Sequence, residues 1–499
     1  MNGGLWLVMS GAYVTQELVA EFGQIPPSFL PVGNRRLYEY QFERIGPTRT
    51  IYLTLPETFR VPAQDDRRLA ELSVTILPIP EGLSLGEAAV FALNLIGGQD
   101  QAVSMLHGDT LIEAMPTADL DWIGISAGSE GYSWAEVTLD GDRIVGVETV
   151  AAGVSREIAA PVVCGLFAFA HTTALVRGIT RSRGSFIGGI LDYARQHPLR
   201  ALEVPVWYDF GHVQTYFRSR RLVTGTRHFN ELRIDGKTAR KTSRDNMKIR
   251  AEASWLADVP PPLRIYCARL IDAGEEKDGR AFYETEYGYL PTLAELFVFG
   301  MLGRPAWTRM LDSCHDFLES CPTCANEVSG DLLLRELTIT KTAARLSRFA
   351  NETGFDVDQM MRYDGQPLPS LMQIAEDIAN HIDFDSKRPA RVMHGDFCFS
   401  NILYDSRVQR IRVIDPRGYV DAERPSIYGD VRYDIAKLSH STVGRYDQII
   451  AGRYHLTSSA NRFDLTFEQL PQHAWLEDAM GDFGVHGVDA GGGGKFARS

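Results

Sequence analysis

The chain has 499 residues, a length that predicts two to four domains at about 100–200 residues each. Hydrophobic residues make up 44% of it and charged residues 23%, which excludes a mainly disordered chain. Lys and Arg number 51 against 64 Asp and Glu, and the net charge of −13 disfavours duplex nucleic acid as a partner, although small anions can still bind locally.

The first 225 residues alternate short apolar strands with amphipathic helices. Strands are predicted at Leu5–Met9, Thr50–Leu53, Val74–Leu77, Ala102–Leu106 and Val162–Ala170. Helices are predicted at Leu37–Arg44 and Leu85–Leu95. This alternation is typical of an α/β domain with a largely parallel sheet, which we expect to span residues 1–225.

The pattern changes near Thr224–Arg227, where we expect a domain boundary. Short strands are predicted at Phe229–Ile234, Ala239–Thr242 and Phe282–Tyr287, with one helix beginning near Lys248. These elements would form the small, strand-rich lobe of a second domain over residues 226–460.

The rest of that domain is predicted to be a larger helical lobe. It is mostly helical from Thr292 to Ile382, and a strand–loop–strand follows at Arg391–Ile414. Residues 461–499 are predicted to be a C-terminal extension. Its glycine-rich end, from Asp482 onward and including Gly491–Gly494, has no apolar face and is expected to be a flexible tail.

Two short motifs in the second domain contain the residues that phosphoryl transfer requires. HGDFCFSNIL begins at His394 and IDPRG begins at Ile414. A hydroxyl nucleophile needs a carboxylate that accepts its proton, and Mg²⁺ needs oxygen ligands beside the phosphates. Asp396, Asn401 and Asp415 could supply all three groups. Each residue alone is common in turns, caps and strand ends, but the combination predicts a kinase site.

This constellation resembles the aminoglycoside phosphotransferase and choline kinase group, a two-lobed α+β branch of the protein-kinase-like fold. The resemblance covers about residues 226–454. It implies that Asp396 is the catalytic Asp and that Asn401 and Asp415 bind Mg²⁺. In the later segment GDVRYDIAKL, it implies that Asp430 and Asp434 brace the catalytic loop.

The same resemblance implies an ATP site in the small lobe. Lys241 would contact the ATP phosphates, and Glu252 on the following helix would pair with it. Glu284, in the segment YETEY, would lie where the chain leads into the hinge beside adenine. No G-x-G-x-x-G motif occurs in this lobe.

Three segments of the first domain carry a second resemblance. They are PSFLPVGNRRLYEY from Pro27, MLHGDT from Met105 and WYDFGHVQTY from Trp207. They resemble sugar-phosphate and choline-phosphate nucleotidyltransferases, which have a Rossmann-like fold. The resemblance implies that Asp109 and Asp209 hold Mg²⁺ while a substrate phosphate attacks the α-phosphate of a nucleoside triphosphate.

The phosphate-binding loop of the first domain departs from that family. The G-x-G-x-R loop expected after the first strand reads SGAYVT, which leaves Gly11 as its nucleotide-binding glycine. Two family lysines are replaced by Ser28 and Thr149. Arg35 and Arg36 are the nearby residues that could restore the positive charge.

A cysteine cluster gives a further candidate site. Cys314, His315, Cys321 and Cys324 have the short spacing of a zinc site, although helix-face and turn cysteines explain the pattern as well. The N-terminus lacks a signal-peptide pattern, and no stretch reaches the roughly 18 apolar residues of a membrane span. We therefore expect a soluble cytoplasmic protein with no membrane partner.

These motifs together predict a bifunctional enzyme. A hydroxyl of a small metabolite would be phosphorylated with ATP, and the phosphate would then attack a second nucleotide, with CTP favoured, and Mg²⁺ at both sites. Such products typically serve capsule polysaccharide or lipid decoration. Two alternatives stay open: a kinase with a non-catalytic first domain, and a regulatory protein that senses nucleotides without turnover. A homo-oligomer is also left open.

Overall fold

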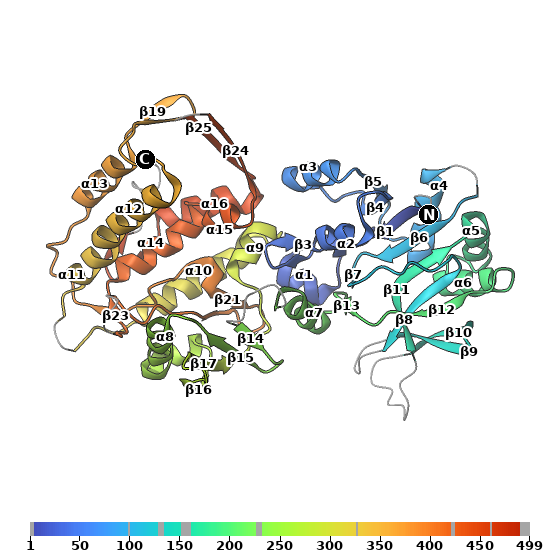
Figure 1. The fold of residues 1–499 in the computed structure, drawn as a ribbon, viewed down its shortest axis with the longest axis horizontal. Helices are drawn as coiled ribbons and strands as arrows, with labels where there is room; N and C mark the ends of the chain where they lie inside the picture. Colours follow the sequence, from blue (N-terminus) through green and yellow to red (C-terminus); the bar gives the residue numbers. More distant parts are fainter. Residues whose placement is uncertain are drawn as a thin grey trace. The chain divides into compact units, whose positions relative to one another are not determined.

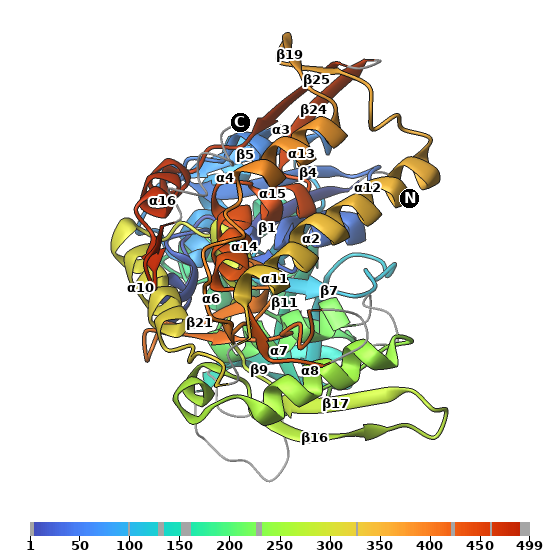
Figure 2. The same ribbon diagram turned by 90° about the vertical axis from the view of Figure 1, so that its left-hand side faces the viewer.

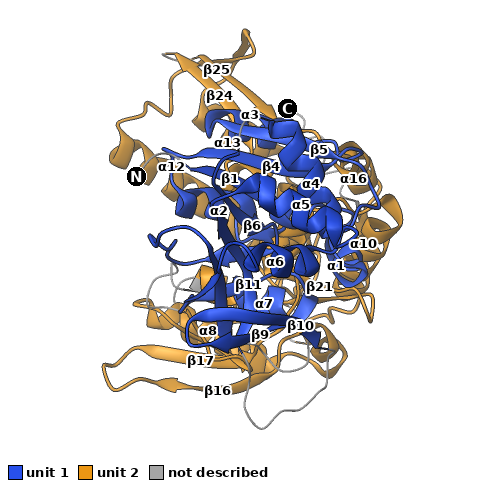
Figure 3. Cartoon of the chain, turned by 90° about the vertical axis from the view of Figure 1, so that its right-hand side faces the viewer, with its two compact units in different colours: residues 1–220 blue, residues 221–499 orange. Residues whose placement is uncertain are grey.

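The computed structural model describes residues 4–97, 100–127, 134–150, 161–225, 232–325, 328–420, 425–459 and 462–489. The chain divides into two compact units, Met1–Arg220 and Arg221–Ser499 (Figure 3). The division falls within helix α7 (Val213–Gly225), a few residues before the boundary that the sequence predicts. Among the described residues, no helix has both the length and the apolar character needed to cross a bilayer.

Unit 1 is built on a mixed nine-stranded sheet of order β5-β4-β1-β6-β11-β8-β12-β10-β9 (Figure 1). Its strands are β1 (Leu5–Met9), β4 (Thr50–Pro56), β5 (Val74–Ile79), β6 (Val103–His107), β8 (Trp122–Ala127), β9 (Trp134–Asp140), β10 (Arg143–Val150), β11 (Pro161–Phe169) and β12 (Arg200–Glu203).

The expected parallel sheet is found in only part of this arrangement. Strands β5, β4, β1 and β6 run parallel, whereas β11 is antiparallel to both β6 and β8. Strands β9 and β10 are joined by a two-residue turn containing Gly141 at φ +64°, so they form a hairpin with no crossover helix. The sheet is therefore parallel on one side and largely antiparallel on the other.

Helices cover this sheet. They are α1 (Gln16–Phe22), α2 (Leu37–Ile45), α3 (Ala63–Glu71), α4 (Leu85–Ile96), α5 (Thr172–Arg181), α6 (Phe186–Ala194) and α7, together with the single turn η1 (Pro27–Phe29). Helix α4 begins at a capping box in which Ser84 and Glu87 satisfy each other's backbone N–H groups. All five residues of β1 are buried, as expected for a central strand.

Two short ribbons complete unit 1. Strand β2 (Pro31–Val32) pairs with β3 (Arg35–Arg36), and β7 (Thr110–Ile112) pairs antiparallel with β13 (Trp207–Asp209). The second ribbon matters for function, because it joins two segments almost 100 residues apart in the sequence.

Unit 2 begins with a four-stranded antiparallel sheet of order β14-β15-β17-β16. The strands are β14 (Leu232–Ile234), β15 (Thr238–Thr242), β16 (Leu270–Glu275) and β17 (Ala281–Glu286). Helix α8 (Asn246–Asp258), capped by the side chain of Asp245, lies against β16 and β17, and the turn η2 (Pro261–Tyr266) follows (Figure 2). The first residues of the predicted strand Phe229–Ile234 lie outside the described residues.

The rest of unit 2 is mainly helical. Its helices are α9 (Leu293–Phe299), α10 (Arg304–Glu319), α11 (Gly330–Arg335), the π-helical turn η3 (Glu336–Thr340), α12 (Lys341–Thr353), α13 (Leu371–His381), α14 (Val431–Thr442), α15 (Tyr446–Ile450) and α16 (Pro471–Gly481). Short strands β20 (Arg391–Val392) and β23 (Tyr428–Gly429) pair with each other, and the turn η4 (Phe399–Asn401) leads into the hairpin of β21 (Ile402–Asp405) and β22 (Arg410–Val413).

The described part of the predicted C-terminal extension belongs to unit 2. Strand β25 (Arg462–Phe467) joins β24 (Tyr454–Ser459), β18 (Met361–Tyr363) and β19 (Gln366–Leu368) in one sheet. Helix α16 contacts α10 and α14, and the small hairpin of β26 (Gly484–Val485) and β27 (Val488–Asp489) contacts α10. Part of the predicted flexible tail is thus packed structure, whereas Gly491–Gly494 lie outside the described residues.

Candidate active sites

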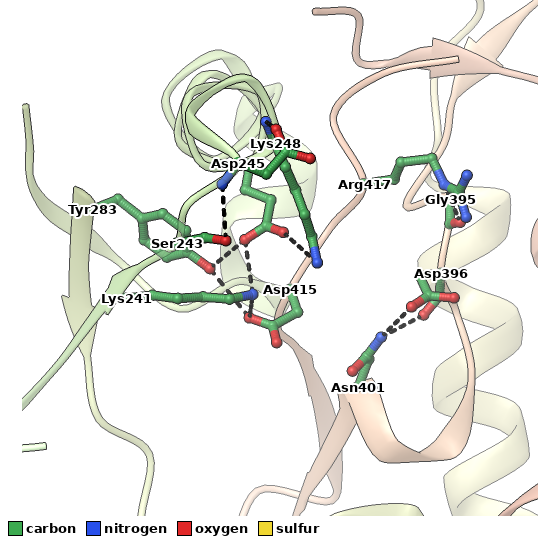
Figure 4. Close-up of polar contacts among 11 residues, drawn as sticks. Lys241, Ser243, Asp245, Lys248, Tyr283, Gly395, Asp396, Asn401, Asp415 and Arg417 are labelled. Atoms are coloured by element: carbon green, nitrogen blue, oxygen red, sulfur yellow. Dashed lines mark hydrogen bonds and ion pairs between the residues drawn. The ribbon is translucent and has the colours of Figure 1, made fainter. Parts of the chain in front are cut away.

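The small lobe of unit 2 contains an ion-paired cluster centred on Lys241 (Figure 4). The Lys241 Nζ lies 2.9 Å from Glu252 Oε2 and 3.0 Å from Asp415 Oδ1. The pairing of Lys241 with Glu252 that the sequence predicts is therefore present. Strand β15 presents the lysine and helix α8 presents the glutamate, so the packing of α8 on the sheet brings them together.

Tyr283 completes this cluster. It stands directly opposite Lys241 in the β15–β17 register. Its hydroxyl lies 2.9 Å from Glu252 Oε2 and 3.1 Å from Asp415 Oδ1, and its one proton can be donated to either carboxylate. Burial and the two carboxylates hold the pKa of Tyr283 well above its usual value, so the hydroxyl stays a donor.

Burial dominates the electrostatics of the cluster. The Glu252 side chain is only 2% exposed, and burial raises the pKa of Glu252 while Lys241 opposes that shift. Burial alone would lower the pKa of Lys241, but the charges of Asp415 and Glu252 outweigh it and raise the value. Lys241 is thus held as a cation by two carboxylates.

Asp415 is positioned by an unusual backbone conformation. Its φ is +54°, in the left-handed region that Asp tolerates better than most residues. Gly418, three residues later, has a φ of +69°, and a Cβ there would lie 2.1 Å from the carbonyl oxygen of Ala251. This segment therefore approaches helix α8 at the residue beside Glu252, which requires glycine.

The second group of the site is built around Asp396. The Asn401 Nδ2 donates to Asp396 Oδ2 at 3.0 Å and to the Asp396 carbonyl oxygen at 2.9 Å (Figure 4). The Lys437 Nζ of α14 lies 2.7 Å from Asp396 Oδ1. Burial would raise the pKa of Asp396, but the Lys437 charge outweighs it and holds the pKa below its ordinary value. The carboxylate is therefore ionised at neutral pH.

Asp434 holds the loop that begins at His394 and contains Asp396. The backbone N–H groups of His394 and Gly395 donate to the Asp434 carboxylate at 2.7 and 2.8 Å. The His394 Nε2 lies 3.0 Å from the carbonyl oxygen of Ile414, and its Nδ1 accepts from the Asp396 N–H at 3.3 Å. Burial lowers the pKa of His394 to about 4, so it is neutral and positions the loop. Asp434 thus has the bracing contacts expected of it, while Asp430 caps α14.

Asn401 and Asp415 fit a Mg²⁺ ion. They flank the β21–β22 hairpin, and Ile414 donates its N–H to the Asn401 carbonyl at 3.0 Å, so the hairpin fixes their spacing. Because Asn401 uses its Nδ2 on Asp396, its Oδ1 is available as a ligand. In the described chain no group of three or more His, Cys, Asp or Glu side chains could hold a metal by itself. Mg²⁺ bound through one or two side chains would complete its shell with phosphate oxygens and water.

Glu284 is not brought to this group. It neighbours Tyr283 on β17, and successive side chains of a strand point to opposite faces of the sheet. Its carboxylate is 3.4 Å from the guanidinium of Arg240. Glu284 is therefore separate from the Lys241 group, and the nucleotide contact expected of it stays a prediction. Tyr283 and Lys437, which the sequence did not single out, both touch site carboxylates.

In unit 1, the β7–β13 ribbon brings Asp109 and Asp209 together. Asp209 stands opposite Thr110, and the Phe210 N–H donates to the Asp109 carbonyl at 2.8 Å. A Cβ on Gly211 would lie 2.7 Å from Asp109 Oδ2 and 3.3 Å from Asp209 Oδ1, so both carboxylates converge on this glycine. Two carboxylates in this arrangement are suited to a divalent cation.

The charge of this pair is only partly balanced. Burial and the neighbouring Asp209 raise the pKa of Asp109 to about 7. His212 lies beside the pair: its Nδ1 is 3.7 Å from Asp209 Oδ2, and Asp209 raises the pKa of His212. His212 lies in the segment WYDFGHVQTY, and the sequence did not single it out.

The arginines expected to supply charge in unit 1 are occupied elsewhere. Arg36 is 1% exposed and donates to Asp65 Oδ2 and the Phe29 carbonyl oxygen. Arg35 pairs with Glu43 at 2.7 Å. Neither contact involves the two site carboxylates, so the structure lends no support to the expectation that these arginines restore the lost charge.

The loop after β1 is held by polar contacts of its own. The Ser10 N–H donates to Thr54 Oγ1 at 2.8 Å, and the Ser10 Oγ accepts from the Ser28 N–H at 3.0 Å. At Gly11, a Cβ would lie 2.9 Å from Ile79 Cγ1. Packing against Ile79 therefore explains this glycine without any bound nucleotide.

The cysteine cluster has the properties of packed core side chains. Cys314 and Cys321 are buried, and burial raises the pKa of both thiols. The Cys321 thiol lies 3.4 Å from the carbonyl oxygen of Phe317, one helical turn earlier. Since the described residues include no three-ligand metal group, zinc binding here has no structural support.

No protein-family model matches the chain, and no curated protein matches it significantly. Among solved structures, a nucleoside-diphosphate-sugar pyrophosphorylase from Vibrio cholerae RC9 has 12% identity and a TM-score of 0.36, and the match covers 44% of this chain and 99% of that one. The UTP-bound UGPase from Acinetobacter baumannii has 15% identity and a TM-score of 0.36, with coverages of 46% and 95%. An aminoglycoside-3'-phosphotransferase of type VIII has 14% identity and a TM-score of 0.30, with coverages of 56% and 96%.

The similar structures thus include both kinds of protein that the motifs resemble, nucleotide-sugar pyrophosphorylases and an aminoglycoside phosphotransferase. At these identities and scores they are likenesses alone, and the roles of individual residues rest on the geometry of the two sites.

Proposed function

We propose that the chain is a cytoplasmic bifunctional enzyme with a nucleotidyltransferase domain over residues 1–225 and a small-molecule kinase domain over residues 226–460. The kinase would phosphorylate a hydroxyl of a small metabolite with ATP. The transferase would then join the phosphorylated metabolite to a nucleotide, with CTP favoured. The product would serve as an activated precursor for surface polysaccharide or lipid decoration.

One observation carries the kinase half of this proposal. Asp415 is ion-paired with Lys241 of the small lobe and lies across the β21–β22 hairpin from Asn401, which is bonded to Asp396. A lysine for phosphates, two oxygen ligands for a metal and an ionised carboxylate are therefore assembled from distant parts of the chain.

Each residue has a defined task in this reaction. Lys241, oriented by Glu252, would hold the ATP phosphates, and Mg²⁺ at Asn401 and Asp415 would neutralise charge on the β- and γ-phosphates. Asp396 would orient the acceptor hydroxyl and accept its proton. Its depressed pKa suits a step in which positioning matters more than basicity, since the transition state is loose.

The kinase-only alternative has one observation in its favour. Arg35 and Arg36 are committed to Glu43 and Asp65, so the transferase site has no arginine from this segment to receive a triphosphate. The convergence of Asp109 and Asp209 favours the bifunctional proposal. A Mg²⁺ ion bound by these two carboxylates would supply positive charge to the nucleotide phosphates.

A coupled assay tests both halves. The protein is incubated with Mg²⁺, ATP and a panel of small alcohols, and ADP and the phosphorylated product are measured. Each product is then supplied with each nucleoside triphosphate, and pyrophosphate release is followed. Asp109→Asn with Asp209→Asn should stop pyrophosphate release and leave phosphorylation intact. Asp140→Asn, at an exposed hairpin of the same unit, is the matched control. Phosphorylation without pyrophosphate release from any nucleotide would leave the kinase-only alternative.

A further inference from the structure

Lys341 lies among three other cationic side chains near Asp396, and we call the four residues the basic cluster: Lys341, Arg345, Arg417 and Lys437. They come from separate parts of unit 2. Lys341 and Arg345 lie one turn apart on α12, Arg417 follows Asp415 in the chain, and Lys437 is on α14. Such a concentration of positive charge is unexpected in a chain whose net charge is −13.

Packing places the start of α12 beside the catalytic loop. Leu337 of the π-helical turn η3 is buried in a small cluster with Met393 and Val420. Met393 immediately precedes His394 of the catalytic loop. Because α12 begins only four residues after Leu337, this contact anchors the end of the helix that carries Lys341.

Arg417 is fixed at the loop itself. Its Nε donates to the Gly395 carbonyl oxygen at 3.0 Å, and its Nη2 donates to the Tyr433 hydroxyl at 3.2 Å. Its Nη1 is buried and has no hydrogen-bond partner in the described chain. In Figure 4, Arg417 lies with Gly395 and Asp396, in a group separate from Lys241 and Tyr283.

The basic cluster carries more positive charge than the Asp396 carboxylate can neutralise. Only Lys437 is paired with Asp396. Lys341 makes no ion pair or hydrogen bond within the described residues, and burial together with Arg417, Arg345 and Lys437 lowers the pKa of Lys341 to about 8, although Asp396 opposes this shift. Half-buried cations that repel one another are stabilised when an anion binds among them.

The anion could belong to the nucleotide or to the acceptor. In the candidate nucleotide group, Lys241 belongs to β15 of the small lobe and Asp415 follows β22. Lys341, Arg345 and Lys437 belong to α12 and α14 of the helical lobe. Lys437 is instead paired with Asp396, and Arg417 is bonded to Gly395 beside it, where the acceptor hydroxyl must lie for its proton to be taken.

We propose that the acceptor is an anionic alcohol, a hydroxyl compound that carries a carboxylate or phosphate group bound by Lys341, Arg345 and Arg417. This inference rests on the proposed kinase function and names its substrate class. The acceptor oxygen attacks the γ-phosphorus of ATP and forms a new O–P bond. The bond from that phosphorus to the β,γ-bridging oxygen breaks, ADP leaves with the electron pair, and the hydroxyl proton passes to Asp396 and then to water.

The test compares alcohols of matched size and different charge under saturating Mg²⁺ and ATP. One set is glycerate, glycerol phosphate, glycerol and serinol, and the other is gluconate, glucose phosphate, glucose and glucosamine, with choline and ethanolamine added. We expect kcat/KM for an anionic member to exceed that of its neutral match at least about tenfold, with the cationic member lowest. The carboxylate and phosphate members of each set distinguish the two sources of the anion.

Two variants connect this preference to the basic cluster. Lys341→Gln and Arg345→Gln should each raise KM for the anionic acceptor about 10- to 100-fold, with little change for its neutral match or for ATP. Arg348→Gln on the same helix is the matched control, because Arg348 is exposed and 3.7 Å from Glu352. Arg345 is exposed as well, so this variant should fold even if Lys341→Gln does not.

Each other outcome overturns the inference in a recognisable way. If neutral or cationic alcohols are preferred, the kinase function stands and the anionic substrate class is wrong. If the variants raise KM for ATP and leave the acceptor unaffected, the basic cluster binds the nucleotide. If the protein phosphorylates no member of either set, the proposed function fails and this inference fails with it.

Discussion

Replacing Lys241 with Met should destabilise the small lobe in a pH-dependent way. The substitution keeps most of the side-chain length and removes the charge that faces Glu252 at 2.9 Å. Glu252, only 2% exposed, would then be a buried carboxylate without its lysine. Removing one partner of a buried ion pair typically lowers the free energy of unfolding by about 3–5 kcal/mol.

The pH dependence follows from the protonation of Glu252. Its ordinary pKa is 4.5, burial raises this pKa in the folded protein, and loss of Lys241 raises it further. Below pH 4.5 the carboxyl group is protonated in both folded and unfolded states, so the cost is absent. Above pH 4.5 the unfolded state loses the proton first, and each further pH unit lowers the free energy of unfolding by about 1.4 kcal/mol. This loss of stability stops growing once the pH passes the pKa of Glu252 in the folded variant.

Hydrogen exchange measured by mass spectrometry can follow this lobe within the full-length protein. Peptides from α8 and β15 should lose up to about 300-fold of their protection at pH 7 and much less near pH 4.5, relative to wild type. Lys248→Met is the matched control, because Lys248 is 48% exposed and 3.9 Å from the same carboxylate, a geometry worth at most about 1 kcal/mol. If the two variants lose equal protection, or if the Lys241→Met loss is the same at both pH values, the buried-pair reasoning is refuted.

Three further outcomes concern catalysis. Asp396→Asn should lower kcat about 10²- to 10⁴-fold while ATP affinity, measured by calorimetry, is retained, because the carboxylate acts on the acceptor hydroxyl. Asp415→Asn should raise the Mg²⁺ concentration needed for half-maximal rate, and an unchanged Mg²⁺ titration would argue against a ligand role. Since the pKa of Lys341 is about 8, KM for an anionic acceptor should rise as pH increases through about 8, where the lysine loses its charge, while KM for a neutral alcohol stays level.

Much of the local structure could be predicted because it depends on residues that are close together in the sequence. The strand Leu5–Met9 was predicted with its bounds, and the helix predicted at Leu37–Arg44 extends one residue further, to Ile45. Asn401 and Asp396 are five residues apart, so a turn suffices to join them. The Lys241–Glu252 pair spans one strand and the next helix. In each case hydrophobic periodicity or a short motif determines which side chains meet.

The antiparallel half of the unit 1 sheet could not be predicted in the same way. Strand β9 alternates Ala135, Val137 and Leu139 with polar residues, but this pattern does not identify β10 as its partner. Strand β12 has only four residues, too few for a periodic pattern. The sheet β19-β18-β25-β24 pairs segments about 100 residues apart whose residues are largely exposed. Such strands are specified by pairing partners that no local pattern identifies.

The site residues that could not be found in the sequence are likewise identified only by their neighbours in the fold. Tyr283 becomes relevant only through its register opposite Lys241, and Lys437 only because α14 passes beside Asp396. Lys437 was visible within the motif GDVRYDIAKL but had no neighbour in the sequence that suggested a role. The helix that carries Lys341 showed nothing beyond its amphipathic pattern.

The charges of the two candidate sites constrain how the proposed reactions can work in sequence. An anionic alcohol gains further negative charge when it is phosphorylated, so the transferase site would receive a more anionic substrate than the kinase did. There, Asp109 and Asp209 are themselves acidic, and the pKa of Asp109 near 7 shows that the pair is close to retaining a proton at neutral pH. His212 lies beside them, and Asp209 raises its pKa. Because Arg35 and Arg36 are occupied elsewhere, a divalent metal must supply most of the positive charge that the nucleotide and the phosphate require. Nucleotide binding by this domain should accordingly depend on metal more strongly than ATP binding beside Lys241.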